Sequence, residues 1–126
     1  MSSRSILIGT RTLIGAATWL APHLAGRLFG LDVKGNPQLP YVARLFAIRD
    51  LALAVGLQAS DGDAARRWVQ IGIACDAADG VAGIIAGRRG ELSPASAVLV
   101  TAAALTAVGL GSSVLGEAEA GSPAAS

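Results

Sequence analysis

The chain has 126 residues, of which 52% are hydrophobic and 15% are charged, whereas a soluble domain usually carries about 25% charged residues. This apolar content excludes a disordered chain. Ten basic and nine acidic residues leave a net charge of +1, which excludes a basic nucleic-acid-binding protein. The single cysteine excludes an internal disulfide framework and a cysteine-rich zinc site. The composition therefore favours a helical membrane protein.

The strongest signal for a membrane span is residues 92–116, which contain no Asp, Glu, Lys, Arg or His. A helix needs about 20 apolar residues to cross a bilayer, so this segment is long enough. Three earlier segments have a suitable length but carry charged residues. The sequence therefore predicts an all-α fold, an integral membrane four-helix up-down bundle over residues 1–116, with spans at about 5–29, 40–59, 68–87 and 93–115 and a disordered polar tail over 117–126.

A multi-pass protein of the cell (plasma) membrane is the corresponding location. The alternative is a soluble four-helix bundle, which needs a polar face on every helix, and the last segment offers only Ser and Thr. The positive-inside rule selects no orientation. Basic residues are divided almost evenly between the end that holds the termini and the opposite end: Arg4, Arg66 and Arg67 against Lys34, Arg88, Arg89 and, by its position, Arg27.

Several residues mark where the helices begin and end. Pro40 suits the first turn of the second helix, because its missing N–H has no partner there in any case. Asp63 ends the turn-forming run at 60–63 and is expected to cap the third helix. Gly90, after two arginines, is a helix-ending pattern, and Ser93 before a proline is expected to cap the last helix.

At least four ionisable residues fall well inside the expected spans, where each charge costs roughly 2.5–3.5 kcal/mol on insertion scales. Asp76 and Asp79 share one helical face because they are three residues apart. Arg49 and Asp50 lie at a similar depth on the preceding helix, and Arg11 is close enough in depth to join them. We therefore expect one polar cluster, in which three carboxylates outnumber the guanidiniums and one acid keeps its proton. The alternative is a structural Arg–Asp network that fixes helix packing.

Other candidate residues surround this cluster. Gly83 and Gly87 form a GxxxG pattern, which permits close helix approach and indicates either ordinary packing or a face for forming a homo-oligomer. Trp19 and Phe46 are the aromatic residues expected at mid-span, where they could line a substrate pocket with Arg11. His23 has no second histidine or cysteine nearby, so no metal site and no cofactor are expected.

The run of residues 41–56 (YVARLFAIRDLALAVG), followed by Cys-Asp-Ala-Ala-Asp at 75–79, resembles a family of small actinobacterial four-span membrane proteins of unassigned function. In size and layout the chain is also similar to the small bacterial membrane terpene cyclases of drimentine and indole-terpenoid pathways. That resemblance implies cyclisation of a prenyl chain, started by protonation of an alkene or epoxide. It carries over no catalytic motif residue by residue.

The leading hypothesis is a small integral-membrane enzyme that cyclises a lipophilic isoprenoid or prenylated substrate by general-acid catalysis. A neutral carboxylic acid in a dry apolar cavity suits that chemistry. Asp79 or Asp76 would be the acid, Arg49 and Asp50 would orient and tune it, and the bilayer would deliver the substrate. The second hypothesis is a non-enzymatic membrane accessory or assembly protein with a structural Arg–Asp cluster. The third is a proton or small-ion conduit.

Overall fold

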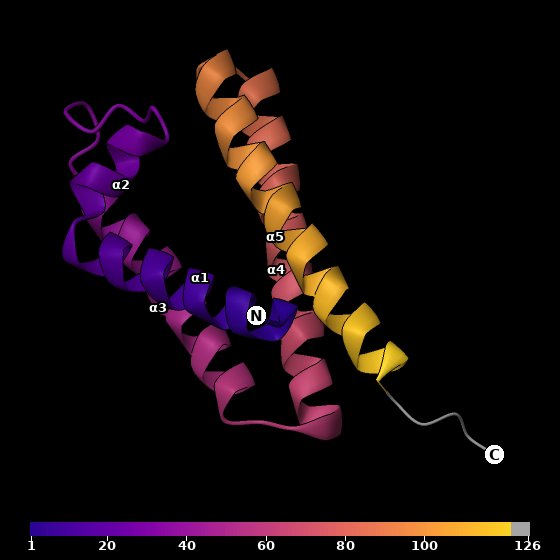
Figure 1. The fold of residues 1–126 in the computed structure, drawn as a ribbon. Helices are drawn as coiled ribbons and strands as arrows, with labels where there is room; N and C mark the ends of the chain where they lie inside the picture. The colour runs from indigo at the N-terminus through magenta and orange to yellow at the C-terminus, as the bar shows by residue number, and fades with distance from the viewer. Residues whose placement is uncertain (122–126) are drawn as a thin grey trace.

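The computed structural model describes residues 1–121, which form five α-helices (Figure 1). No strand occurs in this part of the chain, so the all-α prediction is confirmed. The elements are α1 (Ser3–Leu20), α2 (Pro22–Leu28), α3 (Leu39–Gln58), α4 (Gly62–Arg88) and α5 (Pro94–Ala120).

The four long helices form two close pairs, α1 with α3 and α4 with α5. The pairs meet through smaller contacts between α1 and α5 and between α3 and α4. Helix α2 rises from the end of α1 toward the first turn of α5 (Figure 1). There the hydroxyl of Ser96 donates a hydrogen bond to the carbonyl of Gly30 at 2.9 Å. The chain is thus two hairpins joined at these three places.

The expected first span, residues 5–29, is two helices separated at Ala21, which has φ −134° and ψ 63°. Pro22 begins α2 and has no N–H to donate to the preceding turn. The break leaves the carbonyl of Trp19 without a helical donor, and Arg44 Nε of α3 donates to it at 3.1 Å. A proline that is acceptable at a helix start therefore ends α1 early and turns the chain.

Two of the helices, α4 and α5, are long and apolar enough to cross a membrane by length and composition. Helix α1 has 18 residues and contains Arg4 and Arg11, and α3 contains Arg44, Arg49 and Asp50. Because of these charged residues, α1 and α3 do not meet the same criterion.

The helix boundaries follow the expected signals except at α4. Pro40 lies in the first turn of α3, and the Ser93 hydroxyl accepts a hydrogen bond from Ser96 N at 3.1 Å as the cap of α5. Gly90 has φ +70° just after α4, a conformation that glycine adopts without strain. The expected cap Asp63 is wrong, because α4 begins at Gly62 and Asp63 lies inside its first turn.

The last helix is longer than predicted. Residues 117–120 belong to α5, although the sequence predicts a disordered tail from 117. Glu117 accepts hydrogen bonds from the backbone N–H and the hydroxyl of Ser3 at 3.1 and 2.7 Å, and Arg66 pairs with Glu119 at 3.0 Å. These contacts attach the last turn of α5 to α1 and α4. The rest of the predicted tail, 122–126, lies outside the described residues.

Glycines permit the close approach of α4 and α5. A Cβ atom at Gly83 would lie 2.7 Å from Thr101 Oγ1, and one at Gly87 would lie 2.7 Å from Ala97 Cβ. The face proposed for self-association is therefore covered by α5 of the same chain. The glycines at these positions serve packing within the monomer.

We predict that Gly111→Ala destabilises the protein while Gly109→Ala, two residues away, does not. A Cβ at Gly111 would lie 2.7 Å from Ile73 Cγ1, whereas nothing lies within 4 Å of one at Gly109. Overpacking costs about 1–3 kcal/mol, and an open helical Gly→Ala change stabilises by up to about 1 kcal/mol. Thermal unfolding in detergent would compare them. Equal melting temperatures would contradict the packing described for α4 and α5.

Candidate polar cluster between the hairpins

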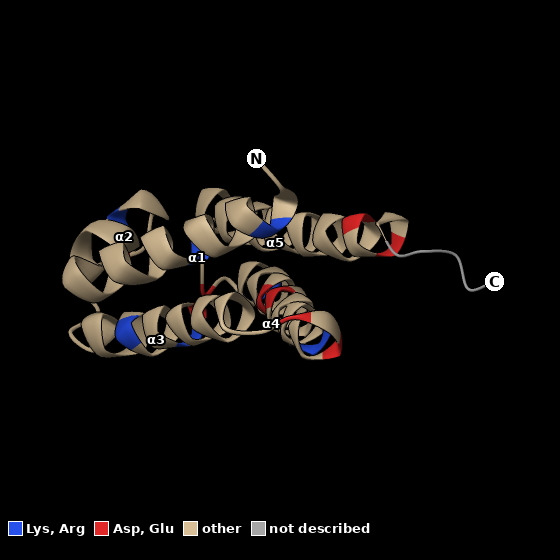
Figure 2. Cartoon of the chain, turned by 60° about the horizontal axis from the view of Figure 1, so that its bottom comes forward, with Lys and Arg blue, Asp and Glu red and all other residues tan. Residues whose placement is uncertain are grey.

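A buried arginine joins three helices at the centre of the structure. Arg11 of α1 donates from Nη1 to Asp50 Oδ1 of α3 at 2.9 Å and from Nη2 to Asp76 Oδ2 of α4 at 2.5 Å. A further bond runs from Nη1 to Asp76 Oδ1 at 3.4 Å. Arg11, Asp50 and Asp76 are only 6%, 4% and 4% exposed. In Figure 2, basic (blue) and acidic (red) positions lie where α1, α3 and α4 come together.

A glycine makes room for this arginine. The backbones of α1 and α4 do not pack directly against each other, so the long Arg11 side chain bridges the distance between them. A Cβ atom at Gly72, one turn before Asp76 on α4, would lie 2.9 Å from Arg11 Nη2. The absence of a side chain at Gly72 therefore lets the guanidinium reach its carboxylates.

A second ion pair lies beside the first and is partly exposed. Arg49 of α3 donates from both terminal nitrogens to Asp79 of α4, at 2.9 and 2.5 Å. Its Nη2 also lies 4.0 Å from Asp50 Oδ1, which connects the two pairs. The Arg49 guanidinium stands 4.7 Å from the ring centre of Phe46, a cation–π geometry. The Arg49 Nε atom is buried and has no acceptor.

The structure brings together all five charged residues that the sequence places in the cluster, but with different roles. Arg49, expected to orient Asp79 or Asp76, pairs with Asp79, whereas Arg11 pairs with Asp76 and Asp50. Both oxygens of Asp76 and both oxygens of Asp79 accept from a guanidinium. Asp50 accepts through Oδ1 alone among the described residues.

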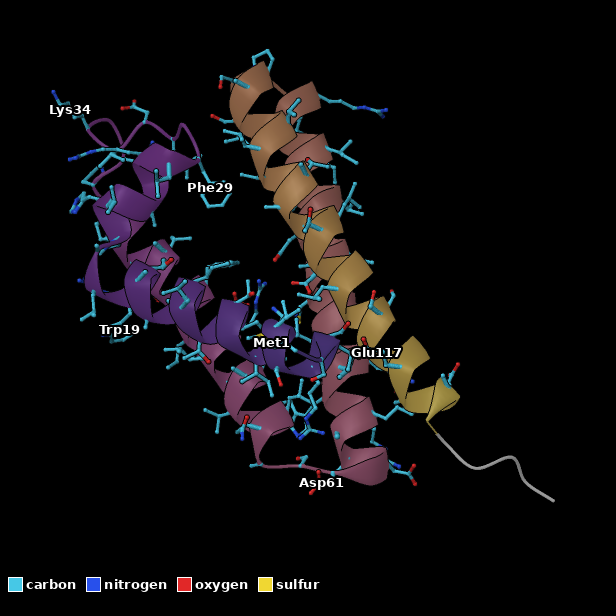
Figure 3. The ribbon with its side chains drawn as sticks, in the orientation of Figure 1. Met1, Trp19, Phe29, Lys34, Asp61 and Glu117 are labelled. Carbon is cyan, nitrogen blue, oxygen red and sulfur yellow. The ribbon has the colours of Figure 1, made fainter. Side chains whose placement is uncertain are left out.

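The expected pocket residues do not form one pocket. Phe46 contacts the cluster through Arg49, and Arg11 is inside it. Trp19 lies at the outer end of α1, away from α4 and α5, as its label in Figure 3 shows. It is 45% exposed and faces Arg44 at 5.9 Å. Trp19 therefore belongs to a different surface from the carboxylates.

That surface is a shallow groove that was not predicted from the sequence. It runs from the loop before α3 along one face of that helix and is lined by Trp19, Pro37, Tyr41, Arg44, Leu45 and Ile48. Their spacing of about one helical turn along α3 was visible in the sequence. The break at Pro22 that brings the end of α1 beside them was not.

The cluster has a defined chemical capacity. Two guanidiniums and three carboxylates leave one excess negative charge, and that charge is shared around Arg11. Within residues 1–121, no group of three His, Cys, Asp or Glu side chains is arranged to hold a metal ion. The arrangement can fasten helices, and it can hold one proton on the half-paired Asp50.

The chain matches no protein-family model, no curated protein and no solved structure. The family resemblances drawn from residues 41–56 and 75–79 therefore stay predictions.

We predict that Arg11→Met lowers stability by about 3–5 kcal/mol, because it leaves two buried carboxylates without a partner. The control Arg66→Met removes an exposed pair with Glu119 and should cost no more than about 1 kcal/mol. Thermal unfolding in detergent would measure both. The triple variant Arg11→Met, Asp50→Asn, Asp76→Asn should recover part of the loss, since no buried charge stays unpaired. Wild-type stability in Arg11→Met would refute the bridging role.

Proposed function

We propose that the chain is a multi-pass membrane protein of the accessory or assembly type, in which the Arg–Asp network fastens two hairpins and performs no catalysis. The membrane location is supported by α4 and α5. Only 28% of the apolar window of α4 and 17% of that of α5 are buried within the protein. A core helix of a soluble protein is mostly buried, so the outward apolar faces require another apolar environment.

Helices α1 and α3 fit the same environment despite their charges. Large apolar residues cover their outer faces, among them Leu13 at 71% exposure and Val55 at 65%. Arg11 and Asp50 point inward and are paired. Ionisable residues inside membrane proteins are tolerated in this arrangement, facing the bundle interior and each other. On this reading α1, α3, α4 and α5 all cross the bilayer.

The observation that favours an accessory role is the pairing of every carboxylate in the cluster with a guanidinium. Two shallow grooves on the described residues are lined by other side chains, and none of the five cluster residues lines either of them. A small helical body with an apolar exterior and a fixed interior makes its contacts through its surface. Such a protein would act by associating with lipid or with partner helices.

We predict that single cysteines introduced in the Cys75→Ser background report four crossings. Asn36→Cys and Glu91→Cys should react with a membrane-impermeant maleimide from one side, and Ser60→Cys from the other. If α4 and α5 alone cross, Asn36→Cys labels with Ser60→Cys instead. Labelling of intact and opened cells would distinguish the two. Release of the protein from membranes by alkaline carbonate would overturn the membrane location altogether.

A second candidate function is the general-acid cyclisation of an isoprenoid. The observation that favours it is the half-paired carboxyl of Asp50, in a cluster with one excess negative charge. Asp79 and Asp76 suit the acid role less well, because both of their oxygens accept from arginine. In this scheme the Asp50 acid protonates an alkene carbon, a second alkene closes the ring on the cation, and loss of a ring proton returns the acid.

If the second candidate holds, Asp50→Asn should reduce turnover by at least about 100-fold, the usual range for losing a general acid. Asp63→Asn, at the start of α4 and outside the cluster, is the matched control. Membranes in heavy water would be incubated with prenylated alkenes, and mass spectrometry would seek a cyclic isomer with one carbon-bound deuterium. No conversion by well-folded protein, or full activity in the Asp50, Asp76 and Asp79 variants, would exclude this function.

A further inference from the structure

The groove on α3 joins a polar end to an apolar end. Pro37 at its start belongs to the polar loop between α2 and α3, and Tyr41 and Arg44 follow at intervals of about one turn. Leu45 and Ile48 continue the same face deeper along the helix and are both about half exposed. This order of side chains matches an amphiphile that lies along α3 with its polar group toward the loop.

Arg44 provides a cation at the polar end of the groove. Its Nε is already used, because it donates to the Trp19 carbonyl that the break at Pro22 leaves open. No carboxylate of residues 1–121 lies within salt-bridge distance of its guanidinium. The Trp19 ring holds the guanidinium at 5.9 Å. Its terminal N–H groups are thus oriented but available to an acceptor from outside the chain.

The charge of this end of the molecule favours an anion. The loop before α3 and the turn between α4 and α5 lie at the same end, opposite Asp61 (Figures 1 and 3). Five basic and two acidic residues give this end a net charge of +3: Arg27, Lys34, Arg44, Arg88 and Arg89 with Asp32 and Glu91. Three basic and four acidic residues give the other end −1: Arg4, Arg66 and Arg67 with Asp61, Asp63, Glu117 and Glu119.

We propose that this groove binds an anionic membrane phospholipid. The terminal nitrogens of Arg44 and the hydroxyl of Tyr41 would take the headgroup phosphate, since guanidinium N–H groups match phosphate oxygens in geometry and charge. One acyl chain would lie over Leu45 and Ile48. The apolar continuation of the groove favours a lipid over free phosphate. The inference rests on the proposed membrane location.

The test uses the full chain with Trp68→Phe, which leaves Trp19 as the single tryptophan. The protein would be reconstituted in phosphatidylcholine vesicles that contain equal fractions of brominated phosphatidylglycerol or brominated phosphatidylcholine. Bromine quenches tryptophan fluorescence at short range. We expect quenching at Trp19 to show about a fivefold preference for the anionic lipid, the size of one basic residue's attraction to such lipids.

Two charge-matched variants locate the preference. Arg44→Gln should abolish it, while Arg89→Gln, at the same end of the molecule, should keep it. Equal quenching by the two lipids in the parent, or an unchanged preference in Arg44→Gln, would overturn the proposal. Loss of the preference when sodium phosphate replaces chloride would assign the site to free phosphate and also overturn it. If the membrane location itself is wrong, the result is different, because neither brominated lipid would then quench Trp19.

Discussion

One buried guanidinium holds the two hairpins of this protein together. Arg11 reaches across the bundle from α1 to carboxylates on α3 and α4, where the backbones of α1 and α4 are too far apart to pack directly. Charge pairing thus connects α1 and α4 beside the apolar cluster in which Leu7 of α1 lies with Val69 of α4. Gly72 is part of the same constraint, since a methyl group there would lie only 2.9 Å from Nη2 of the guanidinium.

Much of the fold could be predicted from the sequence because it depends on local signals. Hydropathy and segment length predict α4 and α5, and short-range chemistry marks Pro40, Gly90 and Ser93 at helix ends. The residues that form the polar cluster could also be predicted from the sequence. Charges in apolar segments have to find each other, and counting residues from each turn gives their depth.

Which arginine pairs with which aspartate could not be predicted from the sequence. Residue spacing gives depth along a helix but not which helices face each other, so it could not assign Asp76 to Arg11 and Asp79 to Arg49. The break after α1 was missed because Pro22 is compatible with either a kink or a helix start, and the Arg44–Trp19 contact that stabilises the break is long-range. The extension of α5 likewise depends on a distant partner, Ser3.

The long separation of Arg11 from its partners has a consequence for biosynthesis. Asp50 follows it by 39 residues and Asp76 by 65. At about 5–20 residues per second, Asp76 is made about 3–13 seconds after Arg11. Arg11 can therefore pair with Asp50 once α3 is made, whereas its second carboxylate arrives only with α4. We expect α1 and α3 to form their close pair first, with α4 completing the pairing of Arg11 afterwards.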